Sequence, residues 1–433
     1  DMGRIGALRV MCNTTSNSFK GTDKSVQQIA TELDVDAAIE ASVSCLGEDS
    51  ICIQARLIYA VGKEQQLWVQ DFRVAKNQIL NFYNDVAKII SEEINIVLSP
   101  QEESMLAEIR TVDPEAYDAY MMGKFFWEKL DRESMQKALD YFELAIEKDP
   151  EWADPYAGLA NAWSMFGMFF RTLPKSVTLP NTYKYLNKAL ELDPNSAQAH
   201  YVKAINAVWQ EFDWEQGEKA FLRSLELNPN DALCHVYYSH LLTILRRSDE
   251  AVIHSNKAVE LDPLKPLILT LAGGRNDDND QSKIQRLEKA LSIDPNFGLA
   301  IVQLNDIHMK TAYANGDFVK WIELWDKKTR GLGHWNDEGR AAVLNAFHEN
   351  GHIAAIEEMF KMNEKYGNDC WMAGGLKAER YLILGEYDKA MDCLEKEYEI
   401  RDMSMTYIAT DENLYNQLKD NPRYIELLKK MNL

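Results

Sequence analysis

Five copies of one short motif divide the middle of the 433-residue chain into units of nearly equal length. Each copy is an apolar helical run that ends on Asp-Pro or Asn-Pro, at Pro150, Pro194, Pro229, Pro263 and Pro295. Proline lacks an amide hydrogen and disfavours helix in the residue before it, so each copy predicts a helix end. The prolines at 194, 229 and 263 are 35 and 34 residues apart, which is the period of a two-helix repeat.

The interior of each unit resembles the tetratricopeptide repeat. Small and large apolar residues at fixed places of both helices carry the resemblance: Tyr156, Leu159, Ala160, Leu186 and Ala189 in the second unit, and Tyr201, Ala204, Trp214, Gly217 and Phe221 in the third. Small residues let two helices approach, and large ones fill the grooves between them. Because neither helix can bury its apolar face alone, the resemblance implies an all-α superhelical solenoid with a concave surface.

The resemblance also implies that first helices build the concave wall of a groove. The corresponding residues here are Tyr120, Lys124, Trp127, Asn161, Asn206, Trp209 and His240. Asn161 and Asn206 take equivalent places in consecutive repeats, which suits bidentate contacts to a peptide backbone. The alternative is that these amides only bond the adjacent repeat or water. We expect a protein or peptide partner in this groove.

Residues 1–98 follow a different pattern. Apolar and polar residues alternate in 39–45, 51–59 and 66–74, which predicts three or four strands in an antiparallel meander. Two helices are expected, over 25–33 and from Ile79 to Val97, and the apolar stripe of the second can cover the sheet. The sequence predicts a small α+β domain.

Five stretches of this domain are similar to the amino-terminal domain of TolB-like proteins: 20–24, 32–36, 40–43, 54–58 and 67–68. In bacteria that domain often precedes a tetratricopeptide array. The first strand of the family and most of its first helix have no counterpart here. We therefore expect an open sheet edge, which favours a homodimer through the N-terminal domain.

The remaining chain is expected to be helical. Residues 99–112 are Glu-rich and lack Gly or Ser runs, which predicts a short rigid linker before an array of about eight helical pairs over 113–410. Gly316, Gly351 and Gly385 mark its later turns, and an apolar insertion near 166–177 is expected to pack on a neighbouring repeat, a partner site being the alternative. Residues 411–433 predict a capping helix with Tyr424, Leu427, Leu428 and Met431 in one stripe.

The six cysteines are scattered without Cys-x-x-Cys spacing, which mildly favours a reducing, cytoplasmic setting. Strict alternation would place Cys45 and Cys52 on opposite faces of a hairpin, so no bridge is expected between them. The net charge of −21 argues against nucleic acid and acidic membrane surfaces as partners. The sequence contains no run of 18 apolar residues and therefore predicts no membrane insertion, so this segment is expected to be soluble.

One motif suggests catalysis, the His-Glu-x-x-His at 348–352. In zinc peptidases both histidines bind the metal because one continuous helix places them a turn apart. Gly351 stands at a repeat turn, so the helix is expected to break inside the motif. Asp277, Asn279 and Glu288 have a calcium-loop spacing but lack the glycine that the bend requires. We expect no metal site and no cofactor.

The sequence thus favours a noncatalytic interaction and sensory module. The combined resemblance implies a likeness to the carboxy-terminal parts of bacterial adenylate cyclases, membrane-anchored serine/threonine kinases and winged-helix regulators, with the effector upstream of residue 1. That context would also allow a periplasmic location. The alternatives are a metal-dependent hydrolase using His348, Glu349 and His352, and a self-assembly scaffold built through residues 1–98.

Overall fold

The computed structural model describes residues 2–46, 49–62, 64–170, 173–274, 280–332, 336–365, 371–372, 375–410 and 416–433. The chain divides into two compact units. The first comprises Asp1–Asn206, Glu215–Cys234 and Glu260–Pro263, and the second comprises Ala207–Trp214, His235–Val259 and Leu264–Leu433. The domain boundaries expected at 98, 112 and 410 remain predictions.

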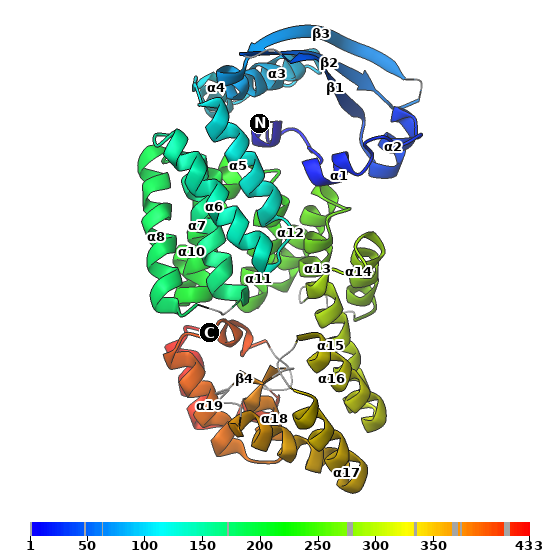
Figure 1. The fold of residues 1–433 in the computed structure, drawn as a ribbon, viewed down its shortest axis with the longest axis vertical. Helices are drawn as coiled ribbons and strands as arrows, with labels where there is room; N and C mark the ends of the chain where they lie inside the picture. Colours follow the sequence, from blue (N-terminus) through cyan, green and yellow to red (C-terminus); the bar gives the residue numbers. More distant parts are fainter. Residues whose placement is uncertain are drawn as a thin grey trace. The chain divides into compact units, whose positions relative to one another are not determined.

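The first unit begins with the expected α+β arrangement. Its sheet has the order β1-β2-β3, with β1 at Ala37–Leu46, β2 at Ser50–Tyr59 and β3 at Gln65–Ala75, all antiparallel. Before it lie η1 (Met2–Arg4), α1 (Asn13–Asn17) and α2 (Val26–Leu33). After η2 (Lys76–Gln78), helix α3 (Ile79–Glu93) lies against β3 (Figure 1). There Phe82 meets Phe72 edge-on at 5.0 Å between ring centroids.

The β1–β2 hairpin departs from strict alternation. A β-bulge between Val43 and Cys45 shifts the register, so that Cys45 and not Ser44 stands opposite Cys52. The extra residue makes Cys45 and Cys52 direct cross-strand neighbours in the backbone register. Cys52 is disulfide-bonded, contrary to the expectation of unbridged cysteines. A bulge leaves no mark in the apolar pattern, so alternation alone could not predict this cross-strand register.

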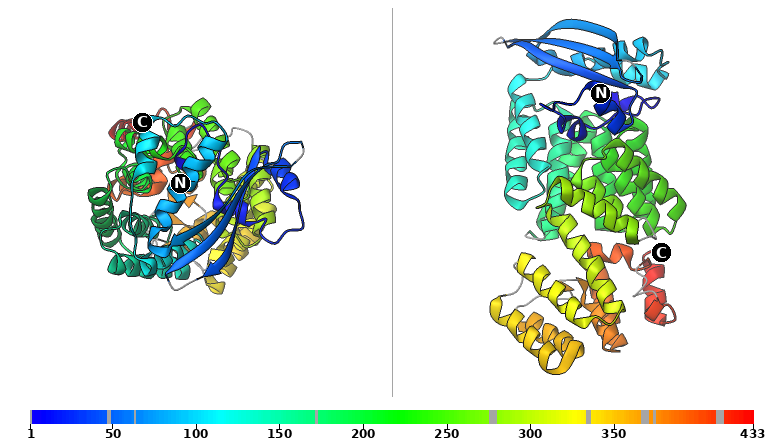
Figure 2. Two further views of the ribbon diagram at one scale, coloured as in Figure 1. Left: turned by 90° about the horizontal axis from the view of Figure 1, so that it is seen from above. Right: turned by 90° about the vertical axis from the view of Figure 1, so that its right-hand side faces the viewer.

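Helical pairs complete the first unit, and the cyan-to-green helices in Figures 1 and 2 show how they stack. Their bounds are α4 Pro100–Ala107, α5 Pro114–Trp127, α6 Arg132–Lys148, α7 Ala153–Met165, η3 Phe166–Phe170, α8 Lys175–Leu192, α9 Ala197–Asn206 and α10 Trp214–Leu227. Phe142 of α6 lies between two glycines of the repeat signature. A Cβ added at Gly123 or Gly158 would lie 2.6 or 2.7 Å from its ring. These glycines therefore let α5 and α7 close on α6.

The apolar insertion after α7 begins as a π-helical turn, η3. Met165, Phe166 and Met168 are buried, and η3 contacts α6, α7 and α8. These three residues thus pack within the array.

The second unit continues the pairs without the proline signature. Its bounds are η4 Ala207–Glu211, α11 Ala232–Ile244, α12 Ser248–Leu261, α13 Pro266–Gly274, α14 Asp280–Ile293, α15 Gly298–Ala314, α16 Phe318–Leu332, α17 Asp337–Lys365, β4 Trp371–Met372, β5 Gly375–Leu376, α18 Lys377–Ile383, α19 Tyr387–Glu399, η5 Met403–Tyr407 and α21 Pro422–Lys430, with α11 and α12 shared between the units. Gly316, Gly351 and Gly385 have φ of 71°, 82° and 72°, so each reverses the chain as predicted.

The fold class is confirmed: a small antiparallel three-stranded sheet is followed by mostly helical, tetratricopeptide-like pairs. The β4–β5 pair was not predicted. None of the described helices has both the length and the apolar composition that a membrane span requires.

Candidate functional site

The seven predicted groove residues are divided between the two units, and we call the group in each unit a wall. The first wall comprises Tyr120, Lys124 and Trp127 on α5, Asn161 on α7 and Asn206 at the end of α9. The second wall comprises Trp209 in η4 and His240 on α11. Lys124 is exposed, whereas the other six are buried.

Tyr120 is the centre of the first wall. Its ring packs on Trp152 at 4.8 Å and on Phe142 at 5.8 Å between centroids. Its hydroxyl donates to Gln198 Oε1 of α9 at 3.5 Å, so the first helices of the first and third repeats meet here. The ammonium of Lys124 lies 5.6 Å from the Tyr120 ring centroid, in a cation–π contact. The aromatic place of the repeat is therefore filled from within.

A partly buried carboxylate, Asp154, lies beside this cluster. Trp152 donates its indole N–H to Asp154 Oδ2 at 3.2 Å. Burial raises the pKa of Asp154, while the positive charges of Arg4 and Lys124 oppose the rise. Burial also raises the pKa of Tyr120, and the negative charge of Asp154 adds to that effect. The first wall thus carries a carboxylate that is harder to ionise than one in water.

The two asparagines differ in their hydrogen bonds. Asn206 donates to the Val202 carbonyl at 2.7 Å and accepts from Ser164 Oγ at 3.2 Å. Its side chain is therefore satisfied inside the array, which is the alternative weighed for both residues. Within the part of the chain that the structure describes, Asn161 Oδ1 is buried without a hydrogen-bond partner, and so is Trp127 Nε1. The first wall consequently holds one acceptor and one donor that protein groups leave unpaired.

The second wall is covered by residues that the repeat pattern does not reveal. Trp209 meets Tyr237 edge-on at 5.4 Å between centroids. His240 Nδ1 lies 2.8 Å from the Tyr407 hydroxyl, and its Nε2 lies 3.0 Å from the Leu271 carbonyl oxygen. A carbonyl can only accept, so Nε2 carries the proton and Nδ1 accepts from Tyr407. Sequence reasoning missed Tyr407, because it lies 167 residues from His240.

The segment before the sheet is also held by the array, within the first unit. Asn230 donates to the carbonyls of Gly3 and Ile5 at 3.1 and 3.3 Å and accepts from the Val10 amide at 3.1 Å. Thr15 donates to Asp262 Oδ1 at 2.6 Å. Asn230 directly follows a predicted helix-ending proline, but the repeat motif assigns it no role. The Asn230 amide binds the backbone of this chain in the way that we expected the groove asparagines to bind the backbone of a partner.

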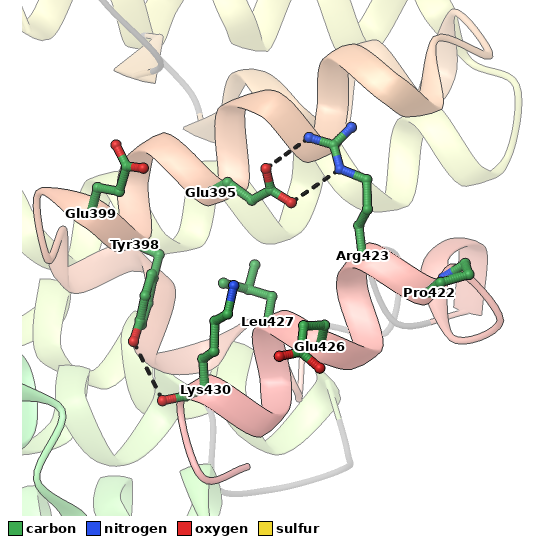
Figure 3. A pocket seen from close by; sticks show the side chains of 8 residues that line it. All are labelled: Glu395, Tyr398, Glu399, Pro422, Arg423, Glu426, Leu427 and Lys430. Carbon is green, nitrogen blue, oxygen red and sulfur yellow. Dashed lines mark hydrogen bonds and ion pairs between the residues drawn. The ribbon is translucent and has the colours of Figure 1, made fainter.

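The C-terminal helix α21 and α19 enclose a hollow of about 380 Å³ (Figure 3). Arg423 and Glu395 form a bidentate pair, at 3.0 Å from Nε to Oε1 and 2.8 Å from Nη2 to Oε2. Hydrogen bonds to Glu395 and Asp392 raise the pKa of Arg423. The stripe residues Tyr424, Leu427 and Met431 are buried, as a capping helix requires. This hollow is a helix-packing feature, since its strongest charges are already paired.

The His-Glu-x-x-His motif does not lie on one continuous helix. Gly351, at φ 82° and ψ −171°, interrupts α17 inside the motif, as predicted. The ring of His352 stacks on Phe318 at 3.6 Å, and burial lowers its pKa, whereas His348 is exposed. Among the residues that the structure describes, no three His, Cys, Asp or Glu side chains are grouped to hold a metal. Asp277 and Asn279 lie outside the described residues.

No family model matches the chain. One curated relative is 24% identical over 217 residues: a protein of Rhizobium meliloti (strain 1021), provisionally named adenylate cyclase 3. The match covers 48% of this chain and 35% of that protein, so the chain spans about a third of the length of the relative.

Several solved structures, one of them named as a tetratricopeptide protein, resemble the chain with TM-scores below 0.5. A thermophilic protein of Thermus thermophilus has 16% identity and a TM-score of 0.36, covering 44% of this chain and 98% of its own. Pseudomonas aeruginosa PilF has 18% identity and a TM-score of 0.36, covering 56% and 96%. The human IFIT1 dimer with PPP-AAAA has 19% identity and a TM-score of 0.44, covering 81% and 77%.

Proposed function

We propose that the chain is a noncatalytic interaction and regulatory module whose first wall binds a peptide or helix of a protein partner. The observation that carries the proposal is the pair of buried, unpaired polar atoms on two contacting first helices, Trp127 Nε1 of α5 and Asn161 Oδ1 of α7. One is a donor and the other an acceptor. Each peptide unit presents one N–H and one C=O, so a partner backbone would supply both missing groups once the side chains that cover these two atoms move aside.

Lys124 gives this site an accessible edge. Its ammonium is exposed and lies over the Tyr120 ring, whereas the rest of the first wall is buried. A partner therefore meets Lys124 first, and a carbonyl or carboxylate of the partner is the group that it attracts.

The test compares full-length baits in affinity capture of partner proteins from the source cell, with each partner identified and its binding measured again in purified form. We expect Asn161→Ala and Lys124→Glu to lose a partner that the wild-type chain retains. Lys184→Glu is the matched control, because the Lys184 ammonium also lies over a tyrosine ring, 4.6 Å from the Tyr185 centroid, but on a second helix. Equal binding by all four chains would contradict the proposal.

The wider context is proposed from two sources. The likeness of residues 1–98 to the TolB-like amino-terminal domain and the relative named adenylate cyclase 3 both favour a regulatory part of a signalling protein. In this role the chain itself makes no product. We expect the purified chain to form no cyclic AMP from ATP and magnesium, and cyclic AMP formation would contradict the noncatalytic assignment.

A second candidate is self-assembly through the sheet. Among the described strands, none pairs with the outer edge of β1. Ile39 and Val43 of β1 are 44% and 64% exposed, although their β2 partners Leu57 and Ile53 are buried. A second copy pairing along β1 would cover this apolar edge. Light scattering would then report a dimer for the wild type and a monomer for Val43→Lys; a monomeric wild type would rule this candidate out.

A further inference from the structure

The second wall holds a short stretch of its own unit, residues 401–410, which we call the C-terminal segment. It contains η5 and the residues that follow it up to Thr410. Asp402 accepts from the Ser404 amide at 2.9 Å and the Ser404 hydroxyl at 2.7 Å, so the segment caps its own turn. Met405 and Ile408 are fully buried. The segment therefore presents a preformed turn with apolar side chains inward.

The contacts between this segment and the wall combine one side-chain hydrogen bond with recognition of backbone carbonyls. Tyr407 donates its hydroxyl to His240 Nδ1 at 2.8 Å. Arg246 Nη2 donates to the Ala409 carbonyl at 2.7 Å. In the other direction, Arg401 donates to the Glu211 carbonyl and lies over the Phe212 ring, at 5.5 Å from its centroid. A guanidinium group binds a main-chain oxygen through a charge-assisted hydrogen bond, which is stronger than a bond between neutral groups.

The wall itself carries two signs of a binding surface. Its first element, η4, is a π-helical turn, a geometry that is rare in proteins and frequent at functional sites. Within this turn, Gln210 is buried and its Oε1 has no hydrogen-bond partner. The C-terminal segment thus covers the second wall without satisfying every polar atom in it.

We infer that the second wall is a peptide-binding site which the C-terminal segment occupies as an internal competitor. The partner that it fits is a short turn with the same chemistry: a tyrosine hydroxyl for His240, an aliphatic residue directly after it, and a main-chain carbonyl for Arg246. Such a partner binds by displacing residues 401–410. This inference rests on the proposed function but concerns a different wall in the other unit.

The test uses the full chain and a fluorescent peptide with the sequence of residues 399–411, followed by anisotropy. We expect Tyr407→Ala in the chain to raise peptide affinity at least tenfold, because the internal competitor is weakened. Adding His240→Ala should abolish that gain, and a peptide carrying phenylalanine for tyrosine should bind at least threefold more weakly. Tyr387→Phe, at an exposed position of α19, should change nothing. Equal affinity of the wild-type and Tyr407→Ala chains would overturn the inference.

A readout on the wild-type chain covers the case in which Tyr407→Ala fails to fold. Excess peptide should increase amide hydrogen exchange in residues 401–410 while leaving α5–α9 unchanged. Unchanged exchange of the segment at saturating peptide would also overturn the inference. Because the probe is a defined peptide, failure here is distinguishable from failure of the proposed function, which is tested through Asn161 and Lys124.

Discussion

The first wall and the second wall are both built from residues of first helices, yet different groups satisfy their polar atoms. In the first wall, Asn161 and Trp127 each keep one polar atom without a partner. In the second, both ring nitrogens of His240 are engaged by groups of the same unit. Long-range packing therefore decides which polar atoms of each wall find a partner within the chain.

The largest expected effect concerns the packing beneath the first wall. Phe142→Ala removes the ring that fills the space between Gly123 and Gly158. We expect it to lower the free energy of unfolding of the first unit by about 3–5 kcal/mol. Urea denaturation followed by hydrogen exchange of each unit measures this. Phe125→Ala, at an exposed position of α5, is the control and should cost less than about 1 kcal/mol.

The walls themselves are compared by His240→Ala and Asn161→Ala. His240→Ala, in the second wall, removes the hydrogen bonds of the imidazole to the Leu271 carbonyl and the Tyr407 hydroxyl. We therefore expect a loss of about 1–3 kcal/mol in the free energy of unfolding. Asn161→Ala, in the first wall, removes an oxygen that has no partner among the described residues. We therefore expect the free energy of unfolding to fall by less than about 1 kcal/mol. Equal losses in denaturant titrations would show that the two walls do not differ as described.

A third comparison uses pH. His254 of the second unit lies 2.8 Å from His235 between Nδ1 atoms, and burial, followed by the His235 charge, lowers its pKa from 6.5 to about 4; Glu250 raises it and Arg247 lowers it slightly. Between pH 6.5 and about pH 4, His254 therefore binds a proton in the unfolded chain but stays neutral in the folded chain. We expect the second unit to lose about 1–2 kcal/mol between these values, after allowance for solvent screening.

His254→Gln should flatten this loss when unfolding is measured from pH 7 to pH 4. The pH dependence expected from Asp154, beside the first wall, has the opposite sign. Its pKa is raised, so the folded state holds a proton that the unfolded state releases. Stability from that group is present at low pH and declines as pH rises through the folded pKa. A first unit that loses stability with the same pH dependence as the second would contradict this contrast.

The smallest expected effect is a difference between two tryptophans that are almost equally buried. Trp214 donates to the Met431 carbonyl, whereas Trp127 Nε1 has no partner. Replacement by phenylalanine removes a similar volume at each site. We therefore expect Trp214→Phe to be more destabilising than Trp127→Phe by about 0.5–1.5 kcal/mol, the net value of one hydrogen bond, in parallel thermal and urea melts.

The sequence by itself determined the repeat period, the helix ends and the break inside the His-Glu-x-x-His motif. Those features depend on proline at 150–295 and on glycines such as Gly351, whose constraints act within a few residues of the backbone. Tertiary structure decided the rest. The bulge before Cys45, the pairing of Tyr407 with His240 and the clamp of Asn230 on the first residues join positions whose contact no local pattern records. A hydrogen bond across 167 residues forms only when packing brings both ends together, so the sequence predicted His240 as a groove residue but could not tell that Tyr407 would bind it.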